Sequence, residues 1–274
     1  MRSSKNRPPR PGFIETLPSS LVRYSLATGK NRSIQVQALR SGTTLKLRYE
    51  CVIFGRLLVP IAFQKGEPME GKAPIFDKIH QDYLVRINNL DLEALSEKIG
   101  TEWTGQSVIL PLFGAPYSIS GADVLDPSGN EPDHSIKVVL CQYLLRHPSR
   151  HPQNKSWTSY KDFRDAAPLA NTYHVNTERE IAGQFACRLN ALKSACLALG
   201  GKSHESALNY DLHMRFDALP RVPILLLFND ADDEFPAQSL LLYERRVKHY
   251  LDMECLAILG RLLAERLSRL GSRN

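Results

Sequence analysis

The chain has 274 residues, of which 43% are hydrophobic and 23% are charged, values typical of a globular protein with one large domain or two small ones. Its apolar runs are far shorter than the roughly 20 residues of a membrane-spanning helix, and no apolar signal segment precedes Ser33. We therefore expect a soluble, cytoplasmic protein.

The net charge of +6 is unevenly distributed. Residues 1–68 contain 12 Lys and Arg against 3 acidic residues, whereas residues 69–274 contain the remaining 23 basic and 26 acidic residues. A basic excess confined to one end is typical of a tail, so we expect nucleic-acid binding only through residues 1–68, if anywhere.

The N-terminal part therefore reads as an extension. Residues 1–32 are rich in Pro, Arg and Ser and are predicted to be disordered, residues 33–63 alternate loosely and predict short strands, and 66–74 read as a linker. We predict a basic, partly disordered extension at 1–68, either an appended tail or an upstream start, and a single main domain at 69–274.

In this domain, local patterns predict several elements in chain order. They are a helix over 75–87, a helix from the cap Asp91 to Gly100, strands over 108–113 and 117–125, and a helix from the cap Asp133 to about His147. A longer helix is predicted over Glu178–Leu199, because Thr177 and Glu180 match a capping box and Gly200 supplies a stop.

The apolar run Val222–Phe228 predicts a strand buried on both faces, with helix 178–199 on one face and a helix over 253–267 on the other. The predicted fold is therefore α+β, a small mixed sheet with a buried strand near 222–228 packed by amphipathic helices.

An acidic run, Asn229–Glu234, follows this strand and has three readings. The carboxylates can form a solvated turn, they can dock a basic protein partner, with Asp230 and Asp232 as contacts, or they can hold a hard cation such as Mg²⁺ or Ca²⁺. The metal reading uses oxygen ligands at Asp211, Asp233, Glu234 and Glu244, with Glu254 nearby, but the spacing lacks the calcium-loop pattern.

Other candidate residues have simpler explanations. Asp252 can cap the last helix, with Glu254 in its first turn, and Pro148 and Pro152 prevent a continuous helix that would pair His147 with His151. Five cysteines show no C-x-x-C spacing, so we expect no intrinsic iron–sulfur cluster, and three of them fit buried helical positions: Cys187, Cys196 and Cys255.

Several segments, in this order, carry a family resemblance. They are Gln142–Leu145, Trp157–Phe163, Gly200-Gly201 with Asp211 downstream, Ala218–Pro223, Asp233–Pro236 and Tyr250–Glu254. With these segments, residues 69–268 resemble the bacterial and archaeal proteins of the domain of unknown function 3786 family. The resemblance carries over no activity, but it implies a setting near iron–sulfur and corrinoid-linked proteins of anaerobes.

Motifs of common enzyme classes are absent from the sequence, including G-x-S-x-G, the phosphate-binding glycine loop and G-x-G-x-x-G. We therefore expect an accessory or binding protein that docks to a protein partner. The alternative is a divalent-metal-dependent enzyme, resembling a hydrolase, that uses the acidic cluster 230–234.

Overall fold

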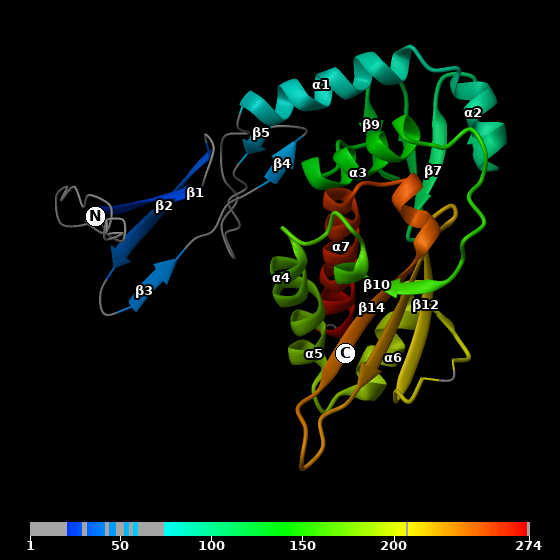
Figure 1. The fold of residues 1–274 in the computed structure, drawn as a ribbon. Helices are drawn as coiled ribbons and strands as arrows, with labels where there is room; N and C mark the ends of the chain where they lie inside the picture. The colour runs from blue at the N-terminus through cyan, green and yellow to red at the C-terminus, as the bar shows by residue number, and fades with distance from the viewer. Residues whose placement is uncertain are drawn as a thin grey trace, which may run out of the picture. The chain divides into compact units, whose positions relative to one another are not determined.

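A computed structural model describes strands between residues 21 and 59 and the segments 74–206 and 208–272, with side chains from residue 77 onward. The predicted disorder of residues 1–20 and the predicted linker at 66–73 lie outside the described residues. The chain divides into two compact units, Met1–Met69 and Glu70–Asn274 (Figure 1).

The first unit contains short antiparallel strands. β1, β2 and β3 form a three-stranded sheet and β4 pairs with β5, with bounds Leu21–Thr28, Arg32–Ser41, Thr44–Leu47, Val52–Phe54 and Leu57–Val59. Strand β1 falls within the stretch 1–32, for which the sequence predicted disorder. Its run Leu-Val-Arg-Tyr lies after the last proline of the stretch and favours an extended backbone.

The second unit begins with helices whose ends follow local signals. Helix α1 spans Pro74–Asn88 and α2 spans Leu92–Ile99. The Asp91 carboxylate accepts a hydrogen bond from the Ala94 amide at 3.0 Å, and Gly100 ends α2 in the left-handed conformation with φ 81°.

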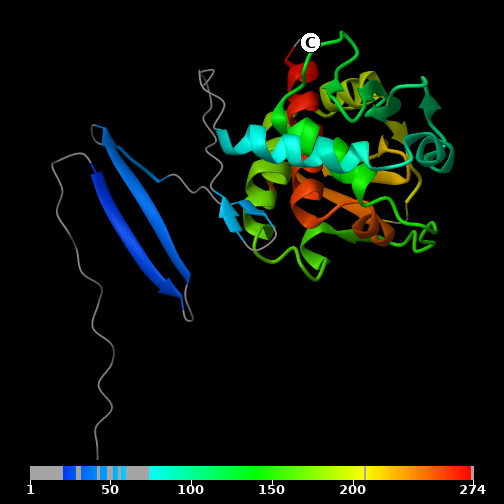
Figure 2. The same cartoon turned by 90° about the horizontal axis from the view of Figure 1, so that it is seen from above.

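A four-stranded antiparallel sheet follows, in the order β6-β7-β8-β9. Its strands are Glu102–Trp103, Val108–Leu112, Ala115–Ile119 and Val124–Leu125. Helix α3, His134–Leu145, comes next and packs between α1 and α7, the last helix of the chain (Figure 2). The amide of Phe113, in the β7–β8 turn, donates to the Ala218 carbonyl at 2.9 Å and so links this sheet to the second one.

The second sheet has five antiparallel strands in the order β10-β14-β13-β12-β11. Their bounds are Trp157–Ser159, Gln238–Glu244, Val222–Asn229, Leu212–Leu219 and Lys202–Ser203. The α+β class and the buried strand are confirmed, but this sheet is antiparallel throughout and not mixed. Strand β12 was not predicted, although Leu212, Met214 and Phe216 alternate inward in the pattern of a half-buried strand.

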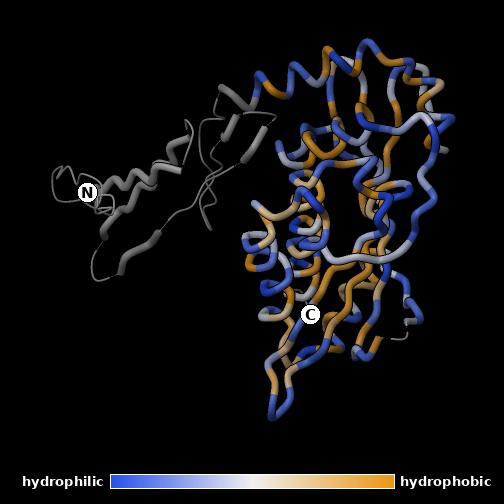
Figure 3. Tube along the Cα trace, viewed as in Figure 1, coloured by the Kyte–Doolittle hydropathy of each residue, from blue (hydrophilic) through white to orange (hydrophobic). Residues whose placement is uncertain are grey.

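Strand β13 is buried on both faces, as expected, but the predicted helical cover is wrong. Side chains of the face that carries Tyr243 and Phe216 meet Gly260 of α7 and Gly201, which follows α6, so the helices lie on that face. On the opposite face Leu225, Leu227 and Leu242 pack against Trp157, Tyr210 and Leu240. Strand residues and a loop, in place of a helix, therefore cover the second face, and Figure 3 shows the hydrophobic colour running along these strands.

The predicted helix at 178–199 is interrupted and begins earlier. Helix α4, Ala170–Tyr173, continues through a π-helical turn, η2, at His174–Glu178 into α5, Arg179–Phe185, and a separate helix α6 spans Leu189–Ala198. Thr177 thus lies inside a helix and forms no capping box. Between α5 and α6 the chain makes a type II turn, with the Arg188 amide 2.9 Å from the Phe185 carbonyl and Cys187 at φ 58°.

Cysteine burial follows the helices. Cys141, Cys196 and Cys255 are buried, whereas Cys187 is exposed at the turn, so its predicted burial is wrong.

The last helix, α7, spans Met253–Gly271 and packs against α3, α5 and α6. It is capped by Asp252, which accepts from the Cys255 amide at 2.9 Å, so the predicted cap is confirmed. No helix in the described part of the chain is long and apolar enough to span a bilayer.

Helix α7 leaves no room for a side chain at Gly260, which faces Tyr173 and Tyr243. Tyr160 and Tyr173 stack at 4.1 Å between centroids, and the Tyr173 and Tyr243 hydroxyls lie 2.8 Å apart. A Cβ atom at Gly260 would stand 2.7 Å from the Tyr243 hydroxyl oxygen and from a ring carbon of Tyr173. Glycine is therefore required here by space.

Gly260→Ala is expected to lower the free energy of unfolding by about 1–3 kcal/mol, because the core must expand around the added methyl group. The matched control is Gly183→Ala on the exposed side of α5, where nothing lies within 4 Å of the new Cβ and a gain of about 0.5–1 kcal/mol is expected. Urea unfolding measures both. Equal effects of the two substitutions would contradict the packing argument.

Candidate functional site

The acidic run after β13 begins with a carboxylate that holds the helical layer in place. Asp230 accepts from the amides of Cys187 at 2.6 Å and Leu189 at 3.3 Å, and so caps the start of α6 from a distant part of the chain. Its own amide donates to the Asp211 carboxylate at 2.8 Å. The carboxylates of Asp211 and Asp230 thus both accept hydrogen bonds from backbone amides.

The tip of the β13–β14 hairpin is ordered by Asp232. This carboxylate accepts from the amides of Glu234 at 2.9 Å and Phe235 at 2.7 Å, and the Asp232 amide donates to the Phe235 carbonyl at 3.0 Å. Such an Asx turn fixes the local backbone. Asp233, Glu234 and Phe235 are exposed on it, and Figure 1 shows the hairpin extending beyond the helices.

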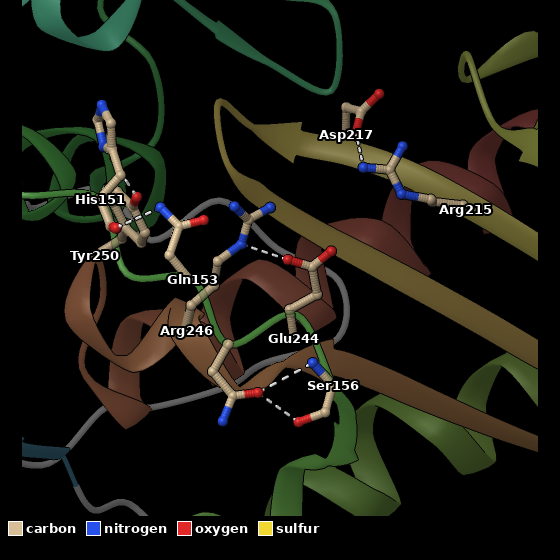
Figure 4. Close-up of polar contacts among 9 residues, drawn as sticks. His151, Gln153, Ser156, Arg215, Asp217, Glu244, Arg246 and Tyr250 are labelled. Carbon is tan, nitrogen blue, oxygen red and sulfur yellow. Dashed lines mark hydrogen bonds and ion pairs between the residues drawn. The ribbon is translucent and has the colours of Figure 1, made fainter.

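Glu244 lies at the other end of β14, six residues beyond Gln238, which corresponds to about 20 Å along an extended strand. It is buried and forms an ion pair with buried Arg246 (Figure 4). The four residues of the predicted metal site, Asp211, Asp233, Glu234 and Glu244, are therefore not brought together. In segments 77–206 and 208–272, no group of three or more His, Cys, Asp and Glu side chains has the arrangement of a metal site.

A second polar cluster lies at the Glu244 end of the sheet, where the loop after α3 runs beside η3, the 3-10 helix Arg245–His249. The Arg246 amide donates to the Asn154 carbonyl at 3.0 Å, and the Gln153 side chain donates to the His151 carbonyl at 3.0 Å. The Tyr250 hydroxyl lies 3.4 Å from His151 Nδ1 (Figure 4). The loop is thus tied to the end of β14.

His147 and His151 meet in this cluster, although no continuous helix carries them, because α3 ends at Leu145. Their ring centroids are 5.5 Å apart in an edge-on contact. The prolines exclude a shared helical face, as predicted, but the loop between them folds both rings onto Tyr250, which His147 contacts at 5.4 Å.

The cluster keeps its histidines neutral. Burial, which is the largest cause, and the charges of Lys98, His151 and Arg221 together lower the pKa of His147 to about 4, against a smaller opposing effect of a backbone hydrogen bond at Pro148. Burial and the charges of Arg221 and Lys98 also lower the pKa of His151. The surroundings therefore disfavour added positive charge.

Sequence reasoning missed Glu178, which the π-helical turn places against the sheet. Its carboxylate accepts from the Leu241 amide at 3.1 Å and lies 2.7 Å from His174 Nδ1, and its carbonyl accepts from the Ser239 hydroxyl at 2.7 Å. Strand β10 pairs only with residues 242–244 of β14, so the rest of this edge of β14 has no neighbouring strand. Glu178 supplies the hydrogen-bond acceptor for the Leu241 amide on this open part of the edge. No local pattern identifies such a contact 63 residues away.

Comparison with known proteins identifies the family. The family model described as domain of unknown function (DUF3786) matches residues 91–266, more than half of the chain, and the protein belongs to that family. The match contains both sheets and helices α2 to α6, most of α7, and both polar clusters. No curated protein and no solved structure matches the chain.

Asp230→Ala is expected to lower the free energy of unfolding by about 0.5–2 kcal/mol, the range for a lost helix cap, because the Cys187 and Leu189 amides lose their acceptor. Asp233→Ala, at the exposed tip, serves as the control and should stay within about 0.5 kcal/mol of the parent. Urea titration of both variants checks this. If Asp233→Ala lowered the free energy of unfolding more than Asp230→Ala, the assignment of a structural role to Asp230 and not to Asp233 would be wrong.

Stability is expected to fall as the pH drops from about 6.5 toward 4. The folded-state pKa of His147 lies below its unfolded value, so the unfolded chain binds more protons in this window and unfolding becomes easier. His147→Phe keeps a ring in the cluster without a titrating group and should flatten the fall in unfolding midpoint. Exposed His249→Gln is the control, and an equal flattening there would count against the assignment.

Proposed function

We propose that the protein is an accessory binding module that docks to a protein partner through the tip of the β13–β14 hairpin. The observation that carries this proposal is Phe235, which is 61% exposed at the tip. Among the described residues five large hydrophobic side chains are strongly exposed, and Phe235 is the aromatic one. Aromatic side chains are enriched in interface cores.

Three exposed acidic residues directly precede Phe235 in the turn: Asp232, Asp233 and Glu234. The partner that fits them has a basic surface with an apolar pocket for Phe235. The acidic charges steer such a partner and fix its orientation, while the ring supplies apolar area. Because Asp232 already orders the turn, the tip loses little conformational freedom on binding.

The role of Asp230 differs from the docking role predicted for it, because its carboxylate is engaged with α6. The docking contacts are therefore assigned to the tip residues 232–235. We place the complex in the cytoplasm, and the setting among iron–sulfur or corrinoid-linked proteins remains a prediction of the family resemblance. Within the described residues no observation favours the metal-dependent enzyme, because Glu244 is paired with Arg246 far from the tip.

Docking is tested by affinity capture with the full chain as bait. The triple variant Asp233→Asn, Glu234→Gln, Phe235→Ser leaves Asp230 and Asp232 intact, so the hairpin and α6 keep their hydrogen bonds. We expect the wild type to enrich a partner that raised salt releases and that the triple variant does not retain.

The control bait is Leu197→Ser, which removes an exposed hydrophobic side chain, 56% exposed, from α6. It should capture the same partner as the wild type. A partner retained equally by the triple variant would contradict docking through the tip.

A further inference from the structure

Segments distant in the chain are joined at the end of the sheet opposite the hairpin tip. The Arg245 amide donates to the Ser156 carbonyl at 2.9 Å, and the Arg246 amide donates to the Asn154 carbonyl at 3.0 Å. The loop before β10 therefore runs beside η3 at this end (Figure 4). The turn between β12 and β13 lies at the same end, because these strands and β14 are antiparallel neighbours.

All three segments present exposed bases, which together form the basic end: Arg150, Lys155, Arg221, Arg245 and Lys248. Neither the loop 146–156 nor the segment 245–251 contains an acidic residue. The acids that flank the second segment are already engaged, since Glu244 is buried in an ion pair with Arg246 and Asp252 caps α7. Among the described residues, the five bases of the basic end form no ion pair.

The hairpin tip carries the complementary charge. Asp232, Asp233 and Glu234 are exposed there and form no ion pair with any described residue. The tip cannot reach the basic end of its own molecule, because β13 separates them with eight residues, about 25 Å of extended strand. Opposite charges held at two ends of one sheet can therefore pair only between molecules.

An exposed arginine can take the place of an apolar pocket for Phe235. A guanidinium group stacks on the face of an aromatic ring, and the protein contains such a contact, with the Arg266 guanidinium 5.0 Å from the centre of the Phe113 ring. Arg221 and Arg245 of the basic end are exposed and accessible to a ring from outside. The basic end thus offers both the charge and the flat contact that the tip requires.

We propose that the partner of the hairpin tip is a second copy of this chain, which receives the tip at its basic end. The proposal rests on docking through the tip and adds the identity of the partner. The contact is heterologous, because the tip of one molecule meets a different surface of the next. A pair therefore retains one free tip and one free basic end, and assembly continues head to tail into chains or closes into rings.

Sedimentation velocity of the full chain over a range of protein concentrations tests this assembly. The wild type is expected to form oligomers that grow with concentration. Their association constant should fall about tenfold when the concentration of sodium chloride is raised about tenfold from low ionic strength, because salt screens exposed charges.

Two variants separate the two surfaces. The tip variant is the triple substitution at 233–235 used for affinity capture, and the end variant is Lys155→Gln, Arg245→Gln, Lys248→Gln. Each alone should associate about tenfold or more weakly than the wild type, since it lacks one half of the contact. An equimolar mixture should form a one-to-one pair and nothing larger, because one intact tip meets one intact basic end and no complementary surface remains.

The matched control replaces three exposed bases of the helices, Arg86→Gln, Arg179→Gln and Lys193→Gln, and so removes the same charge as the end variant. It should associate as the wild type does. All the variants should keep the circular dichroism spectrum and the melting temperature of the wild type, because every substituted side chain is exposed.

The outcomes distinguish this proposal from docking itself. A wild type that stays monomeric at every concentration would overturn self-association but not docking, which the affinity capture tests separately. Association lost by the tip variant and kept by the end variant would overturn the basic end as the receiving surface, and association kept by the tip variant would contradict docking through the tip. A monomeric wild type that binds a short RNA, with binding lost in the end variant, would assign the basic end to nucleic acid instead.

Discussion

Burial of β13 on both faces is the constraint on which the rest of the domain depends. Ile224, Leu225, Leu226, Leu227 and Phe228 are each no more than 1% exposed, and side chains of this kind contribute about 1.5–3 kcal/mol each when fully buried. Because the strand is enclosed in this way, polar side chains lie only at or beyond its two ends. The acidic hairpin therefore lies at one end, and the cluster of His147, His151 and Tyr250 lies at the other.

Two carboxylates join the sheet to its helical layer. Asp230 reaches from the end of β13 to the start of α6, and Glu178 reaches from the π-helical turn to the open edge of β14. Both accept hydrogen bonds from backbone amides, which otherwise remain unsatisfied when buried. Asp230, which the sequence suggested as a docking contact, is thus part of the framework, whereas Asp233 and Glu234 at the tip are exposed.

The two ends of β13 differ in exposure and in charge. The hairpin tip is exposed, acidic and ordered by its own turn, features that fit a macromolecular surface. At the other end His147, His151 and Tyr250 pack against one another, and burial with nearby positive charges lowers the pKa of both histidines.

The sequence by itself determined the elements whose signals are local. Asp91 and Asp252 mark helix starts because each carboxylate accepts from an amide three residues on, and Gly100 marks a helix end because it adopts the left-handed conformation. The apolar run of β13 identifies a buried strand because any apolar neighbours can cover it. The family resemblance was also readable from short segments in their order.

Tertiary structure decided which carboxylates are free and which are engaged. The break between α5 and α6 depends on Asp230, which lies 43 residues beyond Cys187, and the meeting of His147 with Tyr250 depends on a loop folding onto the end of β14. The helices lie on one face of the sheet, and on the other face Leu225, Leu227 and Leu242 pack against Trp157, Tyr210 and Leu240. Such contacts join residues distant in the chain, so no local spacing specifies them, and only the folded backbone brings their atoms within hydrogen-bonding or packing distance.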